Sequence, residues 1–141
     1  MTAKQYLDQI RNYQRRIDRI NDEIARLESV ATNTTQNLTG MPHNPSPSQS
    51  RMADAVCKII DKQNELRIEK NKMEALRMEA TALIAQLENA DYRDLLGKRY
   101  LESKAWEDII CEMGFERSWV YRIHQKALAE VQKALDKKEA T

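Results

Sequence analysis

Residues 95–128 are LLGKRYLESKAWEDIICEMGFERSWVYRIHQKAL, and this stretch decides the predicted fold of the C-terminal part of the chain. Apolar side chains recur in it at helical spacing, first at Trp106, Ile109, Ile110 and Met113, and again at Val120, Ile123, Ala127 and Leu128. Such spacing places apolar residues on one face of a helix and therefore predicts two amphipathic helices that share a small core. Gly114 lies where the first helix must end, in a left-handed backbone conformation that favours glycine. Two helices joined by a tight glycine turn are typical of a helix-turn-helix.

The two predicted helices differ in charge. Residues 102–116 contain five acidic residues against Lys104 alone, whereas residues 117–138 contain six basic residues against Glu130 and Asp136. The net charge of the 141-residue chain is only +1, so any attraction to a polyanion must come from this local asymmetry. Only the second helix is suited to contact phosphates.

A family pattern extends over the last third of the chain. It consists of Arg99 and Tyr100 at the end of one helix, Trp106-Glu107-Asp108-Ile109 at the start of the next, Met113-Gly114-Phe115 at the turn, and Val120, Ile123, Lys126, Ala127 and Leu128 in the last helix. On these residues the segment resembles region 4 of bacterial sigma factors and, more closely, the sigma-region-4-like domains of phage and prophage regulators. With its long upstream helices and its Gly40-Met41-Pro42 loop, the whole chain resembles a phage family related to the ArpU/RinA-like late-gene activators. The resemblance implies a transcriptional regulator that binds double-stranded DNA, and it leaves contact with RNA polymerase open.

The candidate DNA contacts lie on the first turns of the second helix, a recognition helix expected over about 117–136. They are on the side away from Val120 and Ile123: Arg117, Ser118, Trp119, Tyr121, Arg122, Gln125 and Lys126. Arginine suits guanine, glutamine suits adenine, lysine suits phosphate, and exposed aromatic rings can lie against a sugar or a thymine methyl group. For Trp119 and Tyr121, packing against the rod formed by the two long helices is the alternative.

The N-terminal part of the chain has a heptad pattern. Apolar residues alternate spacings of three and four at Ala3, Tyr6, Ile10, Tyr13, Ile17, Ile20, Ile24, Leu27 and Ala31. A second long helix is expected from about Ser50 to Glu88, because apolar residues recur every seven positions at Met52, Ile59, Leu66, Met73, Ala80 and Leu87. Gln63 and Lys70 interrupt this second seam. Both patterns are typical of coiled coils.

Between these helices, residues 31–50 contain no charged side chain and all three prolines, which predicts a flexible linker. Neither apolar seam can remain in water, so the two helices are expected to pair with each other. The predicted fold is all-α: a long antiparallel helical hairpin, or coiled-coil rod, over residues 1–88, followed by a three-helix helix-turn-helix domain over residues 89–141. In that domain a helix from Tyr92 to Leu101, capped by Asp91, supports the other two, and its Gly97 suggests close approach of another helix.

The second seam is broad enough for two neighbours, which favours a homodimer formed through the coiled-coil hairpin. A monomer in which the hairpin is only stabilising is the alternative. Two other functions stay open: a DNA-packaging protein that resembles small terminase subunits, and a structural coiled-coil protein that does not bind DNA.

Several protein classes are disfavoured by the sequence. Its acidic residues are dispersed and no nucleophile–base set can be assembled, so we expect no enzymatic activity. Cys57, Cys111, His43 and His124 lack metal-ligand spacing, and we expect neither a metal nor a cofactor. No apolar run approaches the ~20 residues that span a bilayer, and the N-terminal segment lacks the apolar region of a signal peptide. We therefore expect a cytoplasmic protein without membrane contact.

Overall fold

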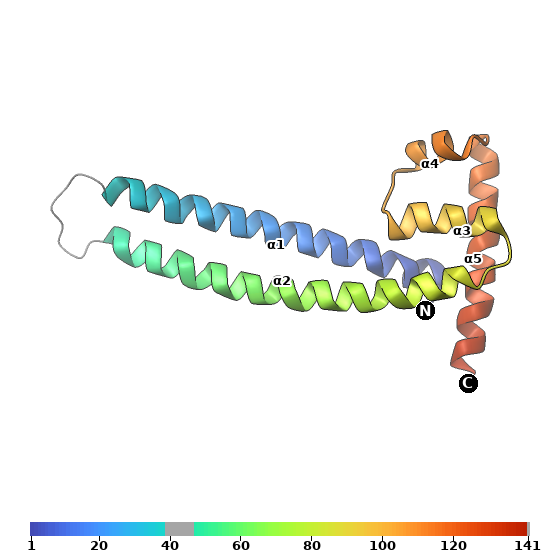
Figure 1. Cartoon of the computed structure of the whole chain (residues 1–141), viewed down its shortest axis with the longest axis horizontal. Coiled ribbons are helices and arrows are strands. Elements are labelled where there is room, and N and C mark those ends of the chain that lie inside the picture. The colour runs from blue at the N-terminus through green and yellow to red at the C-terminus, as the bar shows by residue number, and fades with distance from the viewer. Residues whose placement is uncertain (39–46, 141) are drawn as a thin grey trace. The chain divides into compact units, whose positions relative to one another are not determined.

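The computed structural model of the protein describes residues 1–38 and 47–140, and these residues form helices and short connections without any strand (Figure 1). The helices are α1 (Ala3–Leu38), α2 (Pro47–Ala85), α3 (Ala90–Leu96), the π-helical segment η1 (Gly97–Leu101), α4 (Trp106–Met113) and α5 (Arg117–Glu139). The predicted all-α class is confirmed. Within the described residues, none of these helices combines the length and the apolar character needed to cross a membrane.

Both long helices extend into the predicted linker, whereas α2 ends at Ala85 instead of about Glu88. The expected linker over residues 31–50 is wrong at both ends, because α1 continues to Leu38 and α2 begins at Pro47. Polar residues without glycine or proline can continue a helix, and a proline fits the first helical turn, where its missing N–H would have no partner. Residues 39–46, which include Gly40-Met41-Pro42, lie outside the described residues.

The described chain divides into two compact units. Unit 1 comprises Met1–Tyr13 and Met73–Thr141, and unit 2 comprises Gln14–Lys72. The division therefore does not fall at residue 88, where the sequence analysis places the domain boundary. The reason is that the start of α1 and the end of α2 supply core residues to the C-terminal helices.

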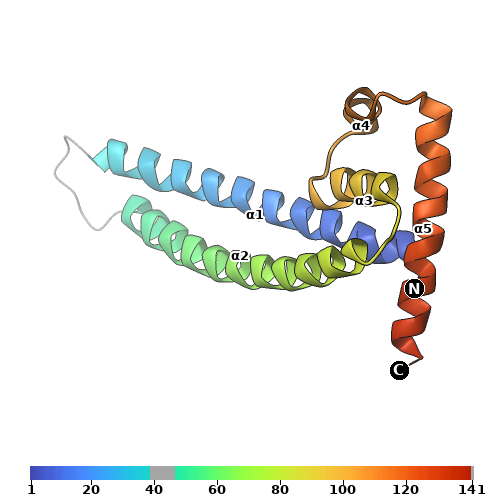
Figure 2. The ribbon, with the colours of Figure 1, turned by 45° about the vertical axis from the view of Figure 1, so that its right-hand side comes forward.

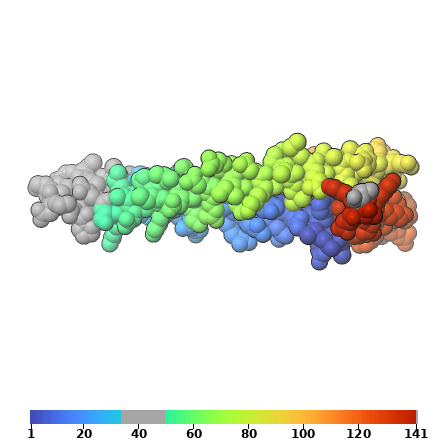
Figure 3. Space-filling model, turned by 90° about the horizontal axis from the view of Figure 1, so that it is seen from below, coloured from blue at the N-terminus to red at the C-terminus, as the bar shows by residue number. Residues whose placement is uncertain are grey.

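In unit 2, the segments of α1 and α2 run side by side in opposite directions (Figures 1 and 2). Ile17, Ile20 and Ile24 of α1 are buried, as the heptad pattern predicts, and Ala55 is buried on α2. Figure 3 shows the α2 segment of this unit (green) over most of the visible face, with α1 (light blue) at its edge. The predicted seam of α1 thus packs within the chain in unit 2.

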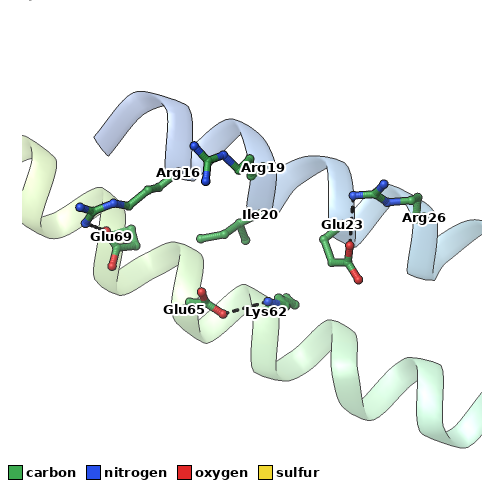
Figure 4. Close-up of a pocket in the computed structure, with 8 residues that line it drawn as sticks. All are labelled: Arg16, Arg19, Ile20, Glu23, Arg26, Lys62, Glu65 and Glu69. Atoms are coloured by element: carbon green, nitrogen blue, oxygen red, sulfur yellow. Dashed lines mark hydrogen bonds and ion pairs between the residues drawn. The ribbon is translucent and has the colours of Figure 1, made fainter. Parts of the chain in front are cut away.

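Polar residues enter the seam of unit 2 at positions that the sequence analysis did not identify. Gln63 and Lys70 are exposed, whereas Lys62 and Glu69 are half-buried. Lys62 Nζ lies 3.2 Å from an oxygen of Glu65, and Arg16 Nη1 lies 3.6 Å from Oε2 of Glu69. Figure 4 shows Ile20 extending from α1 toward α2 between these ion pairs. The polar groups line a groove of about 380 Å³ on the surface of unit 2.

Unit 1 has one apolar core to which every helix contributes. Its buried residues are Ala3, Tyr6, Leu7 and Ile10 of α1, Ala80, Leu83 and Ile84 of α2, Leu87 after it, Leu95, Leu96, Tyr100 and Ile109 of α3, η1 and α4, and Val120, Ile123, Ala127, Val131 and Leu135 of α5. Two polar contacts tie α5 to the long helices. The N–H of Ala3 donates to Oε1 of Gln132 at 2.7 Å, and Nζ of Lys138 lies 2.7 Å from Oε1 of Glu79. A segment that begins near residue 88 would lack the part of this core that α1 and α2 supply.

The helix before α4 differs from its prediction in two ways. Asn89, and not Asp91, caps α3, because its Oδ1 accepts the N–H groups of Asp91 at 2.9 Å and Tyr92 at 3.3 Å. At Gly97 the α-helix changes to a π-helix, and an added Cβ there would meet no atom within 4 Å. The close approach inferred at Gly97 is therefore wrong. Gly97 instead begins the π-helical segment, in which the N–H of Glu102 donates to the carbonyl oxygen of Gly97 at 2.9 Å.

Ile17→Asp tests the packing of α1 in unit 2. An uncompensated carboxylate at this buried position is expected to lower the free energy of unfolding by about 3 kcal/mol. Asn21→Asp adds the same charge at an exposed position of the same helix and should leave stability within about 0.5 kcal/mol of the original. Urea unfolding followed by circular dichroism measures both. Equal stability of the two variants would show that the Ile17 side chain is not buried in solution.

Candidate nucleic-acid interface

The turn between α4 and α5 is built on the backbone of Gly114. This residue has φ 72° and ψ 17°, in the left-handed region, and its N–H donates to the carbonyl oxygen of Ile110 at 3.1 Å. An added Cβ would meet nothing within 4 Å, so backbone conformation, and not lack of space, is what favours glycine. Glu116 then has extended backbone angles, and its carbonyl oxygen accepts the N–H groups of Trp119 and Val120, both at 3.0 Å. The chain therefore leaves α4 and enters α5 within three residues.

One face of α5 is buried in unit 1. Val120, Ile123 and Ala127 are buried as predicted, and Leu128 is half-buried. On α4, Ile109 is buried, and Trp106, Ile110 and Met113 pack at the edge of the core. The apolar spacing that predicted two amphipathic helices thus corresponds to the packed faces.

All seven candidate DNA contacts are exposed on α5: Arg117, Ser118, Trp119, Tyr121, Arg122, Gln125 and Lys126. Ser118, Arg122 and Gln125 follow each other at spacings of four and three, so they share the face opposite the buried one. Within the described part of the chain, Arg122 forms neither a hydrogen bond nor an ion pair. Its guanidinium group is available to a ligand.

The two aromatic candidates differ in their contacts. The Trp119 ring is 43% exposed, and Nζ of Lys126 lies 5.7 Å from its centroid, in the range of a cation–π contact. Tyr121 is 38% exposed, but its ring meets Trp106 edge-on with centroids 5.3 Å apart. These contacts are with α4 and α5 and not with the rod: Tyr121 packs in part against Trp106 of α4, and Trp119 packs against Lys126 of its own helix.

Ion pairs hold several charges beside this face. Arg117 Nη2 lies 2.8 Å from Oε1 of Glu107, and both side chains are more than half exposed. Glu112 of α4 lies 2.9 Å from Lys104 Nζ and 3.5 Å from Lys98 Nζ. The acidic character of α4 is thus partly neutralised by lysines that precede it in the chain.

His124 is a structural residue that the sequence analysis did not identify. It is 6% exposed, and its Nε2 lies 2.7 Å from the hydroxyl oxygen of Tyr100. The Trp106 ring meets it edge-on at 4.7 Å between centroids, and the Arg99 guanidinium carbon lies 4.7 Å from the Trp106 centroid. His124 therefore joins η1, α4 and α5. Its spacing of four from Val120 and three from Ala127, on the apolar face, could have revealed this.

Burial keeps Tyr100 and His124 uncharged. It lowers the pKa of His124 from 6.5 to about 4, and the positive charges of Arg99 and Lys4 add to the effect, whereas Asp8 opposes it. Burial also raises the pKa of Tyr100 to about 12. At neutral pH the hydrogen bond between them joins two neutral groups.

The model of one known protein family matches most of the helices described above. The model of a family described as a protein of unknown function, DUF1492, matches residues 48–132, more than half of the chain. The chain belongs to the DUF1492 family. The region shared with DUF1492 includes α3, η1 and α4, nearly all of α2 and most of α5, and with them all seven candidate residues. No curated protein and no solved structure matches the chain.

Acid should destabilise the protein through His124. The folded state holds a neutral imidazole with a pKa of about 4, whereas the unfolded chain binds a proton near pH 6.5. The unfolded state therefore binds more protons between these values, and the free energy of unfolding falls as the pH drops through this window, by roughly 3 kcal/mol in total. His124→Gln should remove this component, while carboxylate titrations common to both proteins remain. Urea unfolding at a series of pH values measures the difference, and parallel pH profiles for the two proteins would contradict the assignment.

Proposed function

We propose that the protein is a sequence-specific DNA-binding transcriptional regulator of the phage type. In this proposal α4, the Gly114 turn and α5 form a helix-turn-helix, and α5 enters the major groove over about 117–136. The hairpin of α1 and α2 serves as a rod that joins two such heads. The observation that carries the proposal is the exposed face of α5, where Ser118, Arg122 and Gln125 stand opposite a buried apolar face.

The chemistry of this face suits base reading. The planar guanidinium group of Arg122 can donate two parallel hydrogen bonds to O6 and N7 of guanine, and the amide of Gln125 can pair with N6 and N7 of adenine. Ser118 can donate to a phosphate or to a base edge. The three side chains belong to consecutive turns of one helix, so they can reach neighbouring base pairs at the same time.

Cations beside this face suit the DNA backbone. Lys126, held against the Trp119 ring, lies one turn after Arg122, and Arg117 is the first residue of α5; both cations are exposed. The Arg117–Glu107 pair is solvent-exposed, and such pairs contribute about 0–1 kcal/mol, so a phosphate can compete for the guanidinium group. Each phosphate contact releases counterions and makes binding weaker as salt rises.

A role in transcription rests on the family pattern. The residues that resemble sigma region 4 lie at the end of η1, at the start of α4, at the α4–α5 turn and on α5, most of whose matching residues are on its buried face. Regulators of this kind bind as dimers to half-sites about one helical turn of DNA apart, which requires two heads on one assembly. The resemblance therefore supports DNA as the ligand and a dimer as the binding form.

Arg122→Ala tests base reading. If Arg122 contacts guanine, the substitution should weaken binding to the preferred duplex by about 1–3 kcal/mol, or roughly 5- to 150-fold, and reduce discrimination against mutated sites. Lys133→Ala is the matched control, because Lys133 is an exposed cation of the same helix, near Glu130 and further from the turn. It should cost less, and equally on all sequences. Titration of labelled duplexes by fluorescence anisotropy measures both variants. Equal weakening on every duplex by both substitutions would show that α5 is only a cationic surface.

Lys126→Ala tests the phosphate contact. Removal of one phosphate-bound cation should reduce the slope of log affinity against log salt by about one, with little change in sequence preference. The experiment uses the full chain and one duplex over a salt series. An unchanged slope would remove Lys126 from the interface.

A further inference from the structure

The apolar seam of α1 in unit 2 has no room for a second chain. Ile17, Ile20 and Ile24 are between 3% and 9% exposed, so this seam is already covered within the chain. A dimer that uses the rod therefore needs another surface. The helix α2 provides one, because apolar residues also occur on the side away from its buried seam.

This second row of α2 is uncharged and exposed. We call it the outer row, and its members are Ala53, Cys57, Ile60, Asn64, Ile68, Asn71, Ala75, Met78, Ala82 and Ala85. They are separated by three or four residues, which keeps them on one face of a helix. None of the thirteen charged residues of α2 lies in the outer row. Ile60 is 52% exposed and Ile68 is 50% exposed, although both are large apolar residues.

We propose that the outer row of α2 pairs with the outer row of a second copy of this chain, with the two helices parallel and in register. The orientation rests on the proposed function, because parallel pairing places the C-terminal ends of both α2 helices, and hence both α5 helices, at the same end of the dimer. Two recognition helices at one end can engage two half-sites on one duplex.

Asparagines in the outer row favour a second copy over an unrelated partner. Asn64 and Asn71 are seven residues apart, so they lie at nearly the same angle on the outer row, about two helical turns from each other. An amide carries both donors and an acceptor, and two identical amides related by a twofold axis can therefore satisfy each other. Parallel pairing in register places Asn64 opposite Asn64, and Ile60 and Ile68 opposite their own counterparts. A buried asparagine pair between two helices favours one register, as asparagine does at the seam of coiled coils.

The length of the outer row is sufficient for a dimer. From Ala53 to Ala85 it extends about 48 Å along the helix, and with a contact width of about 10 Å two copies bury on the order of 1,000 Å². This area lies near the lower limit for a specific protein–protein interface. The polar asparagine layers and the small alanines favour a dimer of moderate affinity.

Cys57 gives a direct test of this arrangement. It lies in the outer row, is exposed, and in the proposed dimer faces Cys57 of the second copy. The Cα atoms of residues that face each other in this way come within the range that a disulfide can bridge, about 4.4–6.8 Å. The experiment uses the full chain with Cys111→Ser, so that Cys57 is its only cysteine, and no DNA. Sedimentation equilibrium gives the mass, and mild oxidation followed by a non-reducing gel gives the cross-link.

The expected result is a mass of two 16.4 kDa chains and a disulfide-linked dimer after oxidation. As a matched control, Cys57→Ser with Lys58→Cys and Cys111→Ser moves the thiol by one position, off the outer row, and should cross-link far more slowly. Ile60→Asp with Ile68→Asp should give a monomer that keeps its helical circular dichroism. Val30→Asp, at an exposed apolar residue of α1, should remain a dimer.

Three results would overturn the proposal. The first is a monomeric unsubstituted chain. The second is a dimer in which the Lys58→Cys control cross-links as fast as the chain that keeps Cys57. The third is a dimer or larger ring that persists when Ile60 and Ile68 are both replaced by Asp. If the double variant unfolds, the cross-linking comparison still decides, because it keeps both isoleucines. A monomer that binds DNA would refute this interface and the joining of two heads by the rod, and would leave DNA binding by α5 intact. A cross-linked dimer without DNA binding would support this interface and refute the proposed function.

Discussion

Burial of one face of α5 is the constraint on which the candidate interface depends. Val120, Ala127 and Val131 are completely buried in a core that also contains Leu7 of α1 and Leu95 of α3. Because the helix cannot rotate without exposing these residues, the opposite face is fixed toward solvent. The presentation of Ser118, Arg122 and Gln125 is thus a consequence of apolar packing on the other side of the same helix.

Polar contacts refine this orientation at the turn. The hydrogen bond between Tyr100 and His124 and the edge-on contact between His124 and Trp106 connect η1, α4 and α5 inside the core. A buried polar pair of this kind costs free energy if either partner is lost. It therefore favours one arrangement of the three helices, which apolar residues alone would specify less strictly. Gly114 contributes the sharp change of direction that lets α5 follow α4 so closely.

Periodicity alone predicted much of the fold, and its failures have physical causes. The spacing of three and four residues correctly identified the buried seam of α1 and the packed residues Val120 and Ile123 of α5. On α2, periodicity predicted the wrong polar residues in the seam. Gln63 and Lys70 lie next to Lys62 and Glu69 in the sequence, and the spacing of the apolar residues is compatible with either pair. Only the packing of the helix places Lys62 and Glu69 in the seam and leaves Gln63 and Lys70 exposed. Periodicity also placed a boundary near residue 88, since a sequence pattern does not report that Leu7 and Ile10 pack with the C-terminal helices. For the candidate interface, the exposure of all seven predicted residues agrees with the pattern. The burial of His124 is not evident from apolar spacing alone, because histidine is a polar residue, although its position four residues after Val120 puts it on the apolar face of α5.

Selection from a random library of duplex DNA tests the central claim most directly, because it assumes no operator sequence. The full chain is incubated with the library at low salt, bound duplexes are recovered over several rounds, and their sequences are compared with those recovered by the Arg122→Ala variant. The account predicts enrichment of one motif with twofold symmetry, in which guanine is strongly preferred at a position that the variant no longer selects. Recovery of no enriched motif by the unsubstituted chain, or of the same motif with unchanged preferences by the variant, would contradict it.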